Sequence, residues 1–371
     1  MTKKLRVALV HDLIGGVGGS EQVLMELHRM FPEAPIYMAL YKPSRNIGDF
    51  AHVDIRTSFL QCLTSLGPNY EAVVPLMPMA FESFDLRGYD LIVSSCYACS
   101  KGVAAPTGAV HVCYCYTPMR WAWSHREEYL AQIPLRPLTT PAARLIVARL
   151  RQWDYLAAQR VDNFIAISKN VQQRIAKYYH RDSDVVHAPV DIERFPLATA
   201  PEGGQASYLV VSRFFPYKRV EVAVEACTRL AIPLTVIGQG PLLQRIRRKA
   251  GPNVTFLGEV SDEVLSSTYR RCKAVIFTSD EDFGLVPLEA MATGRPVLAL
   301  NKGGAKETIV PGVTGEFYDD SGVEALMEAL SRFHASNYDP VACRRRAEAF
   351  SPARFRDGVK SVIERNLGRA I

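Results

Sequence analysis

The sequence predicts an α/β protein made of two doubly wound domains in tandem, and three observations support this. The chain has 371 residues, about twice the length of a typical single domain. Near the N-terminus a strand, a glycine-rich loop and an amphipathic helix follow one another, as in the first unit of a doubly wound domain. The alternation of strands and helices restarts after a stretch rich in Pro, Gly and Ala at 196–206.

The first predicted domain covers residues 1–195. It begins with the apolar strand LRVALVH at 5–11, continues through the glycine loop GGVGG at 15–19, and enters a helix at Ser20. The further strands expected in this domain are Ile36–Leu40, Leu91–Ser95, Val110–Tyr114 and Asn163–Ile167. Residues 131–160 differ from the rest, because prolines precede a basic helix and five arginines outnumber one aspartate, giving a net charge of +4.

The second predicted domain covers residues 207–350, after a linker at 196–206. Its strands are expected at 208–212, 234–238, 254–258, 274–279 and 296–300. The final segment, 351–371, is predicted to be a helix that could pack back on the first domain. Two such domains are expected to face each other across a cleft, with the carboxyl ends of their strands lining it, where doubly wound sheets bind ligands.

Composition and charge exclude some classes of protein. Charged residues make up 22% of the chain, and no run of about 18 apolar residues is present to span a membrane. The apolar run Val7–Val10 lacks a signal-peptide cleavage site, which favours a cytoplasmic protein. The basic segment 131–160 suits peripheral contact with the inner face of the plasma membrane, and a solvated basic helix face explains it equally well. The net charge of +6 is mild, and without an RNP-like motif or a zinc finger it disfavours nucleic acid as a partner.

The eight cysteines leave two interpretations open. Cys96-x-x-Cys99 and Cys113-x-Cys115 have spacings compatible with zinc. However, Cys113 and Cys115 lie in the alternating, strand-like run AVHVCYCY, and Cys96 follows the apolar run LIVSS. Small buried thiols in a reducing compartment are therefore the favoured interpretation.

Two cations follow the strand at 208–212, in the loop SRFFPYKR. Arg213 and Lys218 suit a diphosphate, since Arg offers a bidentate fork and Lys a point charge. A solvated basic turn is the structural alternative. The glycine loop at 15–19 precedes a helix N-terminus, where free N–H groups attract anions, although it is neither a GxGxxG nor a Walker A motif.

The stretch SDEDFGLVPLEAMATGRPV at 279–297 places two glutamates around a glycine turn and a helix start. Glu281 lies in the loop after a strand, and Gly284 permits a positive φ. Pro287 suits the first turn of a helix, and Glu289 is expected in that same turn. Both carboxylates could then reach one ligand held by the N–H groups at 284–287. The alternatives are a solvated loop acid for Glu281 and a residue that complements the helix dipole for Glu289.

The acidic triple Asp280-Glu281-Asp282 formally matches a site for Mg²⁺ or Mn²⁺ bound with a nucleotide diphosphate. Because Arg213 and Lys218 already supply positive charge, we expect no metal.

Together these motifs resemble the large fourth family of retaining glycosyltransferases, which have the two-Rossmann GT-B fold. The resemblance rests on GGVGGSE at 15–21, SRFFPYKR at 212–219, IGQGP at 237–241, FLGEVSDEVL at 256–265 and SDEDFGLVPLEAMATGRPVLALNKGGAKETI at 279–309. It covers most of the chain. VHDLIGG at 10–16 and YTPMRWAW at 116–123 resemble a bacterial branch of mannosyltransferase-like enzymes that build O-antigen and exopolysaccharide.

The resemblance implies a role for each motif residue. Arg213 and Lys218 would hold the donor diphosphate, Glu289 the ribose hydroxyls, and Glu281 the sugar hydroxyls near the leaving group. Backbone N–H groups would complete the donor site, from Gly15 and Gly16 and from Phe283, Gly284, Leu285 and Val286. The implied enzyme needs neither metal nor cofactor. Its favoured donor is GDP-mannose, and its acceptor is a glycan or a polyprenyl-diphosphate-linked oligosaccharide.

One departure from the family pattern concerns the loop Tyr116-Thr117-Pro118-Met119-Arg120. The branch often carries a histidine where this chain has Tyr116, and that histidine commonly faces the donor sugar. Tyr116, His125 and His11 are the candidates for the sugar-facing residue here.

The expected reaction is retaining transfer of a hexose, mannose favoured, in surface polysaccharide synthesis. Because no nucleophile is placed for a double displacement, we expect same-face attack within an ion pair, with the leaving phosphate accepting the acceptor proton. Two other classes stay open. A nucleotide-sugar 2-epimerase is disfavoured by the Glu-x7-Glu pair, and a non-catalytic sugar-nucleotide-binding protein by the joint presence of all four charged motif residues.

Overall fold

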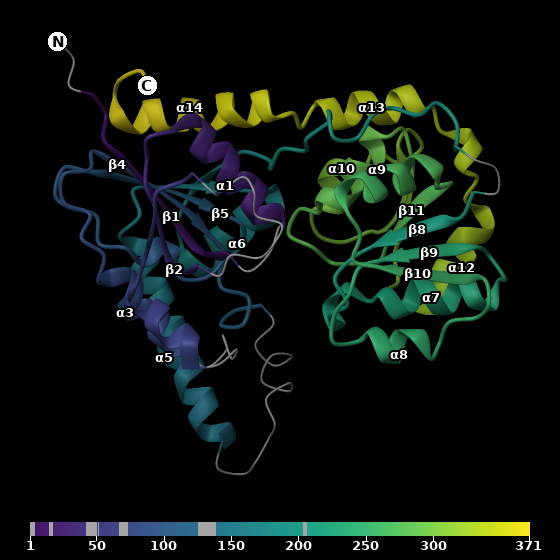
Figure 1. The fold of residues 1–371 in the computed structure, drawn as a ribbon, viewed down its shortest axis with the longest axis horizontal. Helices are drawn as coiled ribbons and strands as arrows, with labels where there is room; N and C mark the ends of the chain where they lie inside the picture. Colours follow the sequence, from purple (N-terminus) through teal and green to yellow (C-terminus); the bar gives the residue numbers. More distant parts are fainter. Residues whose placement is uncertain are drawn as a thin grey trace. The chain divides into compact units, whose positions relative to one another are not determined.

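The structure is a computed structural model that describes residues 4–14, 18–41, 50, 52–66, 73–124, 139–202 and 206–371 (Figure 1). It divides into two compact units. The N-terminal unit comprises residues 1–187 together with Phe355–Ile371, and the C-terminal unit comprises Ala188–Arg354. Each unit is built on a parallel sheet with alternating helices, so the predicted α/β fold class is confirmed.

The sheet of the N-terminal unit has the order β3-β2-β1-β4-β5-β6-β7, and all its pairs are parallel. Its strands are β1 (Val7–Ile14), β2 (Ile36–Tyr41), β3 (Ile55–Thr57), β4 (Leu91–Cys96), β5 (Val110–Cys115), β6 (Asn163–Ala166) and β7 (Ser183–Val185). Val10 of β1 faces Tyr37 of β2 on one side and Ser94 of β4 on the other. The chain order reverses between β1 and β4, which is the switch point where such sheets bind ligands.

Helices cover both faces of this sheet. They are α1 (Gly19–Met30), η2 (Phe59–Leu66), η3 (Val74–Leu76), α3 (Met77–Glu82), η4 (Ser100–Gly102), α5 (Thr139–Gln159), α6 (Lys169–Tyr179) and α14 (Pro352–Leu367). On one face Ala8, Val10 and Ile92 pack with Met77 and Phe81 of α3. Burying a side chain of the size of Met or Phe contributes ~1.5–3 kcal/mol, so this layer fixes the strands that end at the switch point.

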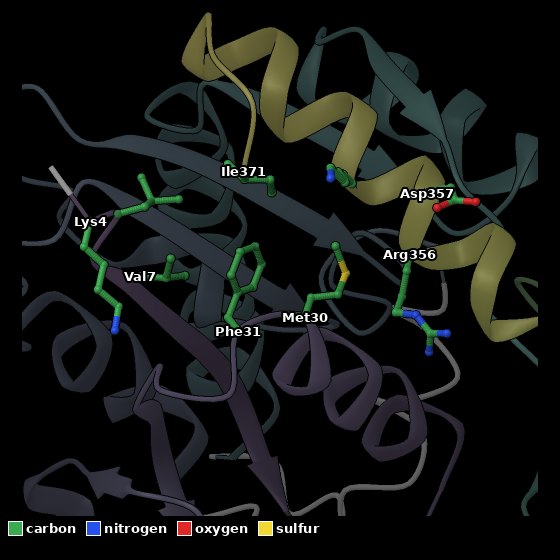
Figure 2. Close-up of a pocket in the computed structure, with 9 residues that line it drawn as sticks. Lys4, Val7, Met30, Phe31, Arg356, Asp357 and Ile371 are labelled. Atoms are coloured by element: carbon green, nitrogen blue, oxygen red, sulfur yellow. The ribbon is translucent and has the colours of Figure 1, made fainter. Parts of the chain in front are cut away.

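Helix α14 closes the N-terminal unit. Phe355 packs edge-on against Tyr114 of β5, with ring centroids 5.5 Å apart. Arg356 pairs with Glu26 of α1 at 2.6 Å. Between α1 and α14 lies a hollow of about 400 Å³, lined by residues that include Met30, Phe31 and Arg356 (Figure 2). Val7, the first residue of β1, also lines it, so the hollow lies at the amino end of that strand, away from the carboxyl ends.

The sheet of the C-terminal unit has the order β10-β9-β8-β11-β12-β13, the dinucleotide-binding order of doubly wound folds. Its strands, all parallel, are β8 (Tyr208–Val211), β9 (Leu234–Ile237), β10 (Val254–Gly258), β11 (Ala274–Phe277), β12 (Val297–Leu300) and β13 (Gly315–Tyr318). The switch point lies between β8 and β11.

The helices of this unit are η5 (Pro216–Lys218), α7 (Val220–Arg229), α8 (Leu243–Arg247), α9 (Asp262–Arg271), α10 (Leu285–Ala292), α11 (Ala305–Thr308), α12 (Val323–Arg332), η6 (Ala335–Asn337) and α13 (Pro340–Glu348). Val224 of α7 and Leu326 of α12 belong to the core on one face. Helices α10 and α13 pack on each other and bury Leu288, Met291 and Cys343.

All eight cysteines are free, and all except Cys62 are buried. Within the described ranges, no helix is both long enough and apolar enough to cross a membrane.

Candidate functional site

The switch point of the C-terminal unit brings together two predicted site residues from different loops. Lys218, at the end of η5 after β8, lies with its Nζ 2.5 Å from Oε1 of Glu281, which follows β11. The two side chains are 12% and 20% exposed, so a ligand at this edge could reach them. The backbone carbonyl of Lys218 also accepts hydrogen bonds from Thr278 Oγ1 (2.7 Å) and Ser279 Oγ (3.3 Å). The loop after β11 therefore fixes the position of the lysine.

Glycines in two neighbouring loops let the backbones of these loops pack closely against the loops that carry the motif residues. Gly238, with φ +126°, leaves no room for a Cβ, which would lie 1.9 Å from the carbonyl oxygen of Ser212. Next to it, Phe214 N donates to Gln239 O at 2.9 Å. A Cβ on Gly304 would lie 2.2 Å from the Cα of Phe283, and Gly304 N donates to Glu281 O at 2.8 Å. The glycines of IGQGP and NKGG thus act as spacers that position the loops carrying the charged residues.

Arg213 lies in the loop just after β8, with an exposed side chain. Its guanidinium carbon is 5.7 Å from the ring centroid of Phe215. Among the residues that the structure describes, it forms no ion pair. Arg213 is therefore a cation at the site edge that can accept an anion without first losing a carboxylate.

Glu289 occupies a different place from the one expected. Helix α10 begins at Leu285, after Gly284 in a left-handed conformation (φ +86°), so Glu289 is its fifth residue and the prediction of a first-turn glutamate is wrong. The side chain instead meets α9, where the buried Tyr269 OH donates to Glu289 Oε2 at 2.7 Å.

The surroundings of Glu289 act on its pKa in both directions. Burial raises the pKa of Glu289, and the charges of Asp262 and Glu281 raise it further, while the Tyr269 hydroxyl and Arg194 oppose this shift. Sequence reasoning missed Tyr269, because the contact joins residues of separate helices.

The N-terminus of α10 is the remaining part of this site. Phe283 is buried, with its ring 5.8 Å from that of Phe350. Gly284, Leu285 and Val286 follow at the helix start, where the first N–H groups have no intrahelical acceptor and carry the positive end of the helix dipole.

The switch point of the N-terminal unit is occupied by Asp12, which sequence reasoning missed. Its fully buried carboxylate accepts backbone N–H groups from four consecutive residues, Tyr97, Ala98, Cys99 and Ser100, at 2.6–2.9 Å. Such multiple donation holds the loop after β4 against the carboxylate. The sequence signal was an acid that follows His11 within a largely apolar strand.

His11 and Tyr116, two of the three sugar-facing candidates, lie on one hydrogen-bonded chain. His11 Nδ1 is 3.0 Å from Ser95 Oγ, which is 2.8 Å from the Tyr116 hydroxyl, and that hydroxyl donates to Ser20 O at 2.9 Å. Within the described part of the chain, the buried His11 Nε2 has no hydrogen-bond partner. Burial lowers the pKa of His11, which keeps the imidazole neutral. Gly15, Gly16 and His125 lie outside the described residues.

No group of three His, Cys, Asp or Glu side chains that could hold a metal ion is found among the described residues. At the acidic triple 280–282, the carboxylate of Glu281 is paired with Lys218.

Comparison with known proteins identifies the class. Two doubly wound units, each a single parallel sheet, are the architecture of GT-B proteins. The family model for Glycosyltransferase Family 4 matches residues 17–194, and the model for Glycosyl transferases group 1 matches residues 191–350. Together the two models cover residues 17–350, one for each unit, so the chain belongs to the glycosyltransferases that these two models describe.

Curated relatives include both a glycogen synthase and mannosyltransferases. The glycogen synthase of Mycobacterium tuberculosis is 31% identical over 51% of this chain, and the match spans about half the length of that relative, 48%. The alpha-1,3/1,6-mannosyltransferase ALG2 of Homo sapiens is 25% identical over 86% of this chain and 85% of its own. The O-antigen chain mannosyltransferase C of Escherichia coli is 30% identical over 34% of this chain and 37% of its own.

A solved structure has the same fold over nearly the whole chain. HepE of Anabaena in complex with UDP superimposes with a TM-score of 0.71 at 18% identity, covering 97% of this chain and 100% of its own. At this identity the likeness establishes the fold.

Proposed function

We propose that this protein transfers a hexose from a nucleotide-diphosphate sugar to a glycan or lipid-linked oligosaccharide acceptor, with retention of configuration and without a metal ion. The single observation that carries the proposal is the Lys218–Glu281 pair at the C-terminal switch point, a cation and a carboxylate on adjacent strand-end loops. Mannose and GDP-mannose are the favoured sugar and donor, supported by the two mannosyltransferase relatives. The bound UDP of HepE supports a nucleotide-linked donor in general.

In this proposal the donor diphosphate binds Lys218 and Arg213, with the N-terminus of α10 adding its free N–H groups. Breaking the bond between the anomeric carbon and the diphosphate leaves negative charge on the phosphate, which preorganised cations stabilise. The acceptor hydroxyl attacks the same face of the sugar and gives its proton to the departing phosphate oxygen.

The ion pair gives Glu281 a defined role in the unloaded protein. It holds the Lys218 side chain in place and balances its positive charge before the donor arrives. A diphosphate that binds Lys218 takes over as counter-ion, so the carboxylate of Glu281 becomes available to accept hydroxyl groups of the sugar. Glu281 then orients the sugar, and no proton transfer is assigned to it.

Glu289 is proposed to bind the ribose hydroxyls, as an acceptor already oriented by Tyr269. Since burial raises the pKa of Glu289, acidification through this pKa protonates an acceptor that the ribose needs. Nucleotide affinity should therefore fall as the pH is lowered, and less so in Glu289→Gln, which does not titrate.

The test begins with thermal shifts in the presence of GDP, UDP and ADP sugars. A donor present at ~100 times its Kd stabilises the protein by ~2.7 kcal/mol, so the correct base should stand out. Nucleotide release on adding acceptors then separates a transferase from a 2-epimerase, which releases no nucleotide, and from a binding protein, which does not react. A Glu281→Gln variant that transfers at the full rate would remove the sugar-orienting role.

The proposed place of action is the cytoplasmic side, in surface polysaccharide synthesis, where nucleotide sugars are made and lipid-linked acceptors are extended.

A further inference from the structure

Helix α5 of the N-terminal unit exposes large apolar side chains. Its first half extends away from the sheet (Figure 1). Leu145 is 59% exposed, Ile146 is 42% exposed, and Leu156 on the same side is 53% exposed. Residues 145, 146, 149, 153 and 156 fall within about 100° around a helix of 3.6 residues per turn, so the apolar side chains form one stripe that contains Arg149.

An apolar groove of about 420 Å³ runs beside this stripe. Leu145, Ile146 and Trp153 line it from α5, and Pro75 and Pro78 line it from η3 and α3. Trp153 Nε1 donates to Glu82 Oε1 of α3 at 2.9 Å, which joins α5 to α3 beside the groove.

The exposed charges of α5 itself all have one sign. Arg144 and Arg149 are exposed on α5, and Arg151 is exposed with its guanidinium 4.3 Å from the ring centroid of Trp123. The one carboxylate of the helix is Asp154, which is fully buried and paired with Lys101. The exposed face of α5 therefore offers apolar side chains and arginines. The neighbouring acid in the described part of the chain, Glu82 of α3, is paired with Arg160 and bonded to Trp153.

We propose that α5 docks on a bilayer with anionic headgroups, with its apolar stripe in the acyl boundary and its arginines among the phosphates. Apolar stripes flanked by arginine are the feature that holds helices in the plane of a membrane interface. A second copy of the chain on this face would oppose arginines to arginines, so the charge favours lipid. The inference rests on the proposed function, since an enzyme using a lipid-linked acceptor gains from lying at the surface that holds it.

The experiment measures co-sedimentation of the full chain with vesicles of phosphatidylcholine, alone or with about 30% phosphatidylglycerol. Binding is expected to anionic vesicles only, and to weaken in high salt. Leu145→Glu with Ile146→Glu should reduce binding at least tenfold, because two charges would enter the apolar boundary. The matched control, Leu257→Glu with Val264→Glu, places the same charges at similarly exposed apolar sites of the C-terminal unit and should bind like the parent.

Removal of charge tests the headgroup contact separately. Arg144→Gln with Arg149→Gln should weaken binding to anionic vesicles about 30-fold, while the exposed pair Arg245→Gln with Arg248→Gln on the second unit should change it little. Equal binding to both vesicle types would overturn the proposal. So would a concentration-dependent dimer that Leu145→Glu with Ile146→Glu abolishes, since a second copy would then cover this face.

The thermal shift with nucleotide sugars is measured on the same variants. Variants of α5 should keep the parent's shift, since α5 lies outside the donor site. If no nucleotide sugar shifts even the parent while vesicle binding follows the pattern above, the proposed function fails and the docking surface stands.

Discussion

The two switch points of this molecule have the same topology, but their polar side chains are buried in one and accessible in the other. In the N-terminal unit, Asp12, His11 and Tyr116 are buried, and most of their polar atoms are hydrogen-bonded within the unit. In the C-terminal unit, Lys218 and Glu281 are partly exposed, and Arg213 is exposed without an ion pair among the described residues. A buried network stabilises a fold, whereas accessible charges on loops fixed by glycine spacers are available to a ligand. Substitutions at the first switch point should therefore act on stability, and substitutions at the second on activity.

The largest effect is expected at the buried pair behind the first switch point. Lys101 of η4 pairs with Asp154 of α5, which also accepts hydrogen bonds from Trp123 Nε1 and Tyr179 OH at 2.8 and 2.7 Å. Burial by itself lowers the pKa of Lys101, but the charge of Asp154 and its neighbours outweighs this, so the pKa lies well above its ordinary value. Lys101→Met leaves Asp154 buried without a cation, and the free energy of unfolding should fall by ~3–5 kcal/mol.

Urea unfolding measures this loss, with Lys249→Met as the control. Lys249 forms an exposed pair with Glu225, which contributes only ~0–1 kcal/mol. Although its melting temperature is lower, the Lys101→Met protein should still be stabilised by the donor, with the same rise in melting temperature as the parent. If the folded Lys101→Met protein no longer binds the donor, a ligand must contact the first switch point.

Lys218→Ala should have the opposite profile. Loss of one preorganised cation at the leaving phosphate should raise the barrier by ~2.7–4 kcal/mol, a fall in kcat/KM of about 10²–10³. The unfolding free energy should change by less than ~1 kcal/mol, because the Lys218–Glu281 pair is partly exposed. Steady-state nucleotide release measures the first quantity, with Lys249→Ala as the matched control. A Lys218→Ala protein that binds and turns over the donor normally would rule out the diphosphate assignment.

Acidification should weaken the N-terminal unit more than the site of the C-terminal unit. Burial lowers the pKa of both His11 and His111, that of His111 to about 3, with Arg160 adding to the shift. Below the ordinary histidine pKa of ~6.5 the unfolded chain binds protons that the folded chain does not. Stability should then fall by ~1.4 kcal/mol per pH unit for each histidine, down to its folded pKa. His111→Gln should remove one such contribution, as measured by urea titrations at pH 7.0 and 5.5. If the unfolding free energy of the variant falls between these two pH values as much as that of the parent, the argument is contradicted.

Sequence reasoning located the fold better than the contacts within it. A strand was predicted at 274–279, from an apolar run before a glycine-containing loop, and the structure has it at Ala274–Phe277. β3, β7 and β13 were missed, because IRT, SDV and GEFY are only three or four residues long and carry no apolar pattern. Their place depends on neighbouring strands that the local sequence does not encode.

The candidate site shows the same limit. Lys218 and Glu281 were each predicted in a loop after a strand, and the family resemblance implied that both bind one donor. The four N–H groups that bind Asp12 come from residues 97–100, far along the chain, and Tyr269 meets Glu289 only because α9 packs near α10. Such pairings follow from packing in three dimensions, which no spacing of motif residues determines.

The smallest expected effect concerns Tyr116, which stands where the family branch often has a sugar-facing histidine. Its hydroxyl is engaged on both sides, donating to Ser20 O and accepting from Ser95 Oγ. Tyr116→Phe removes both bonds while keeping the ring. The free energy of unfolding should therefore fall by ~0.5–1.5 kcal/mol, and kcat/KM for the donor should stay unchanged. Chemical unfolding and nucleotide release on one preparation measure the two quantities. If kcat/KM falls tenfold while stability holds, the hydroxyl leaves this network to meet the sugar, and the contrast between a structural and a ligand-binding switch point breaks at this residue.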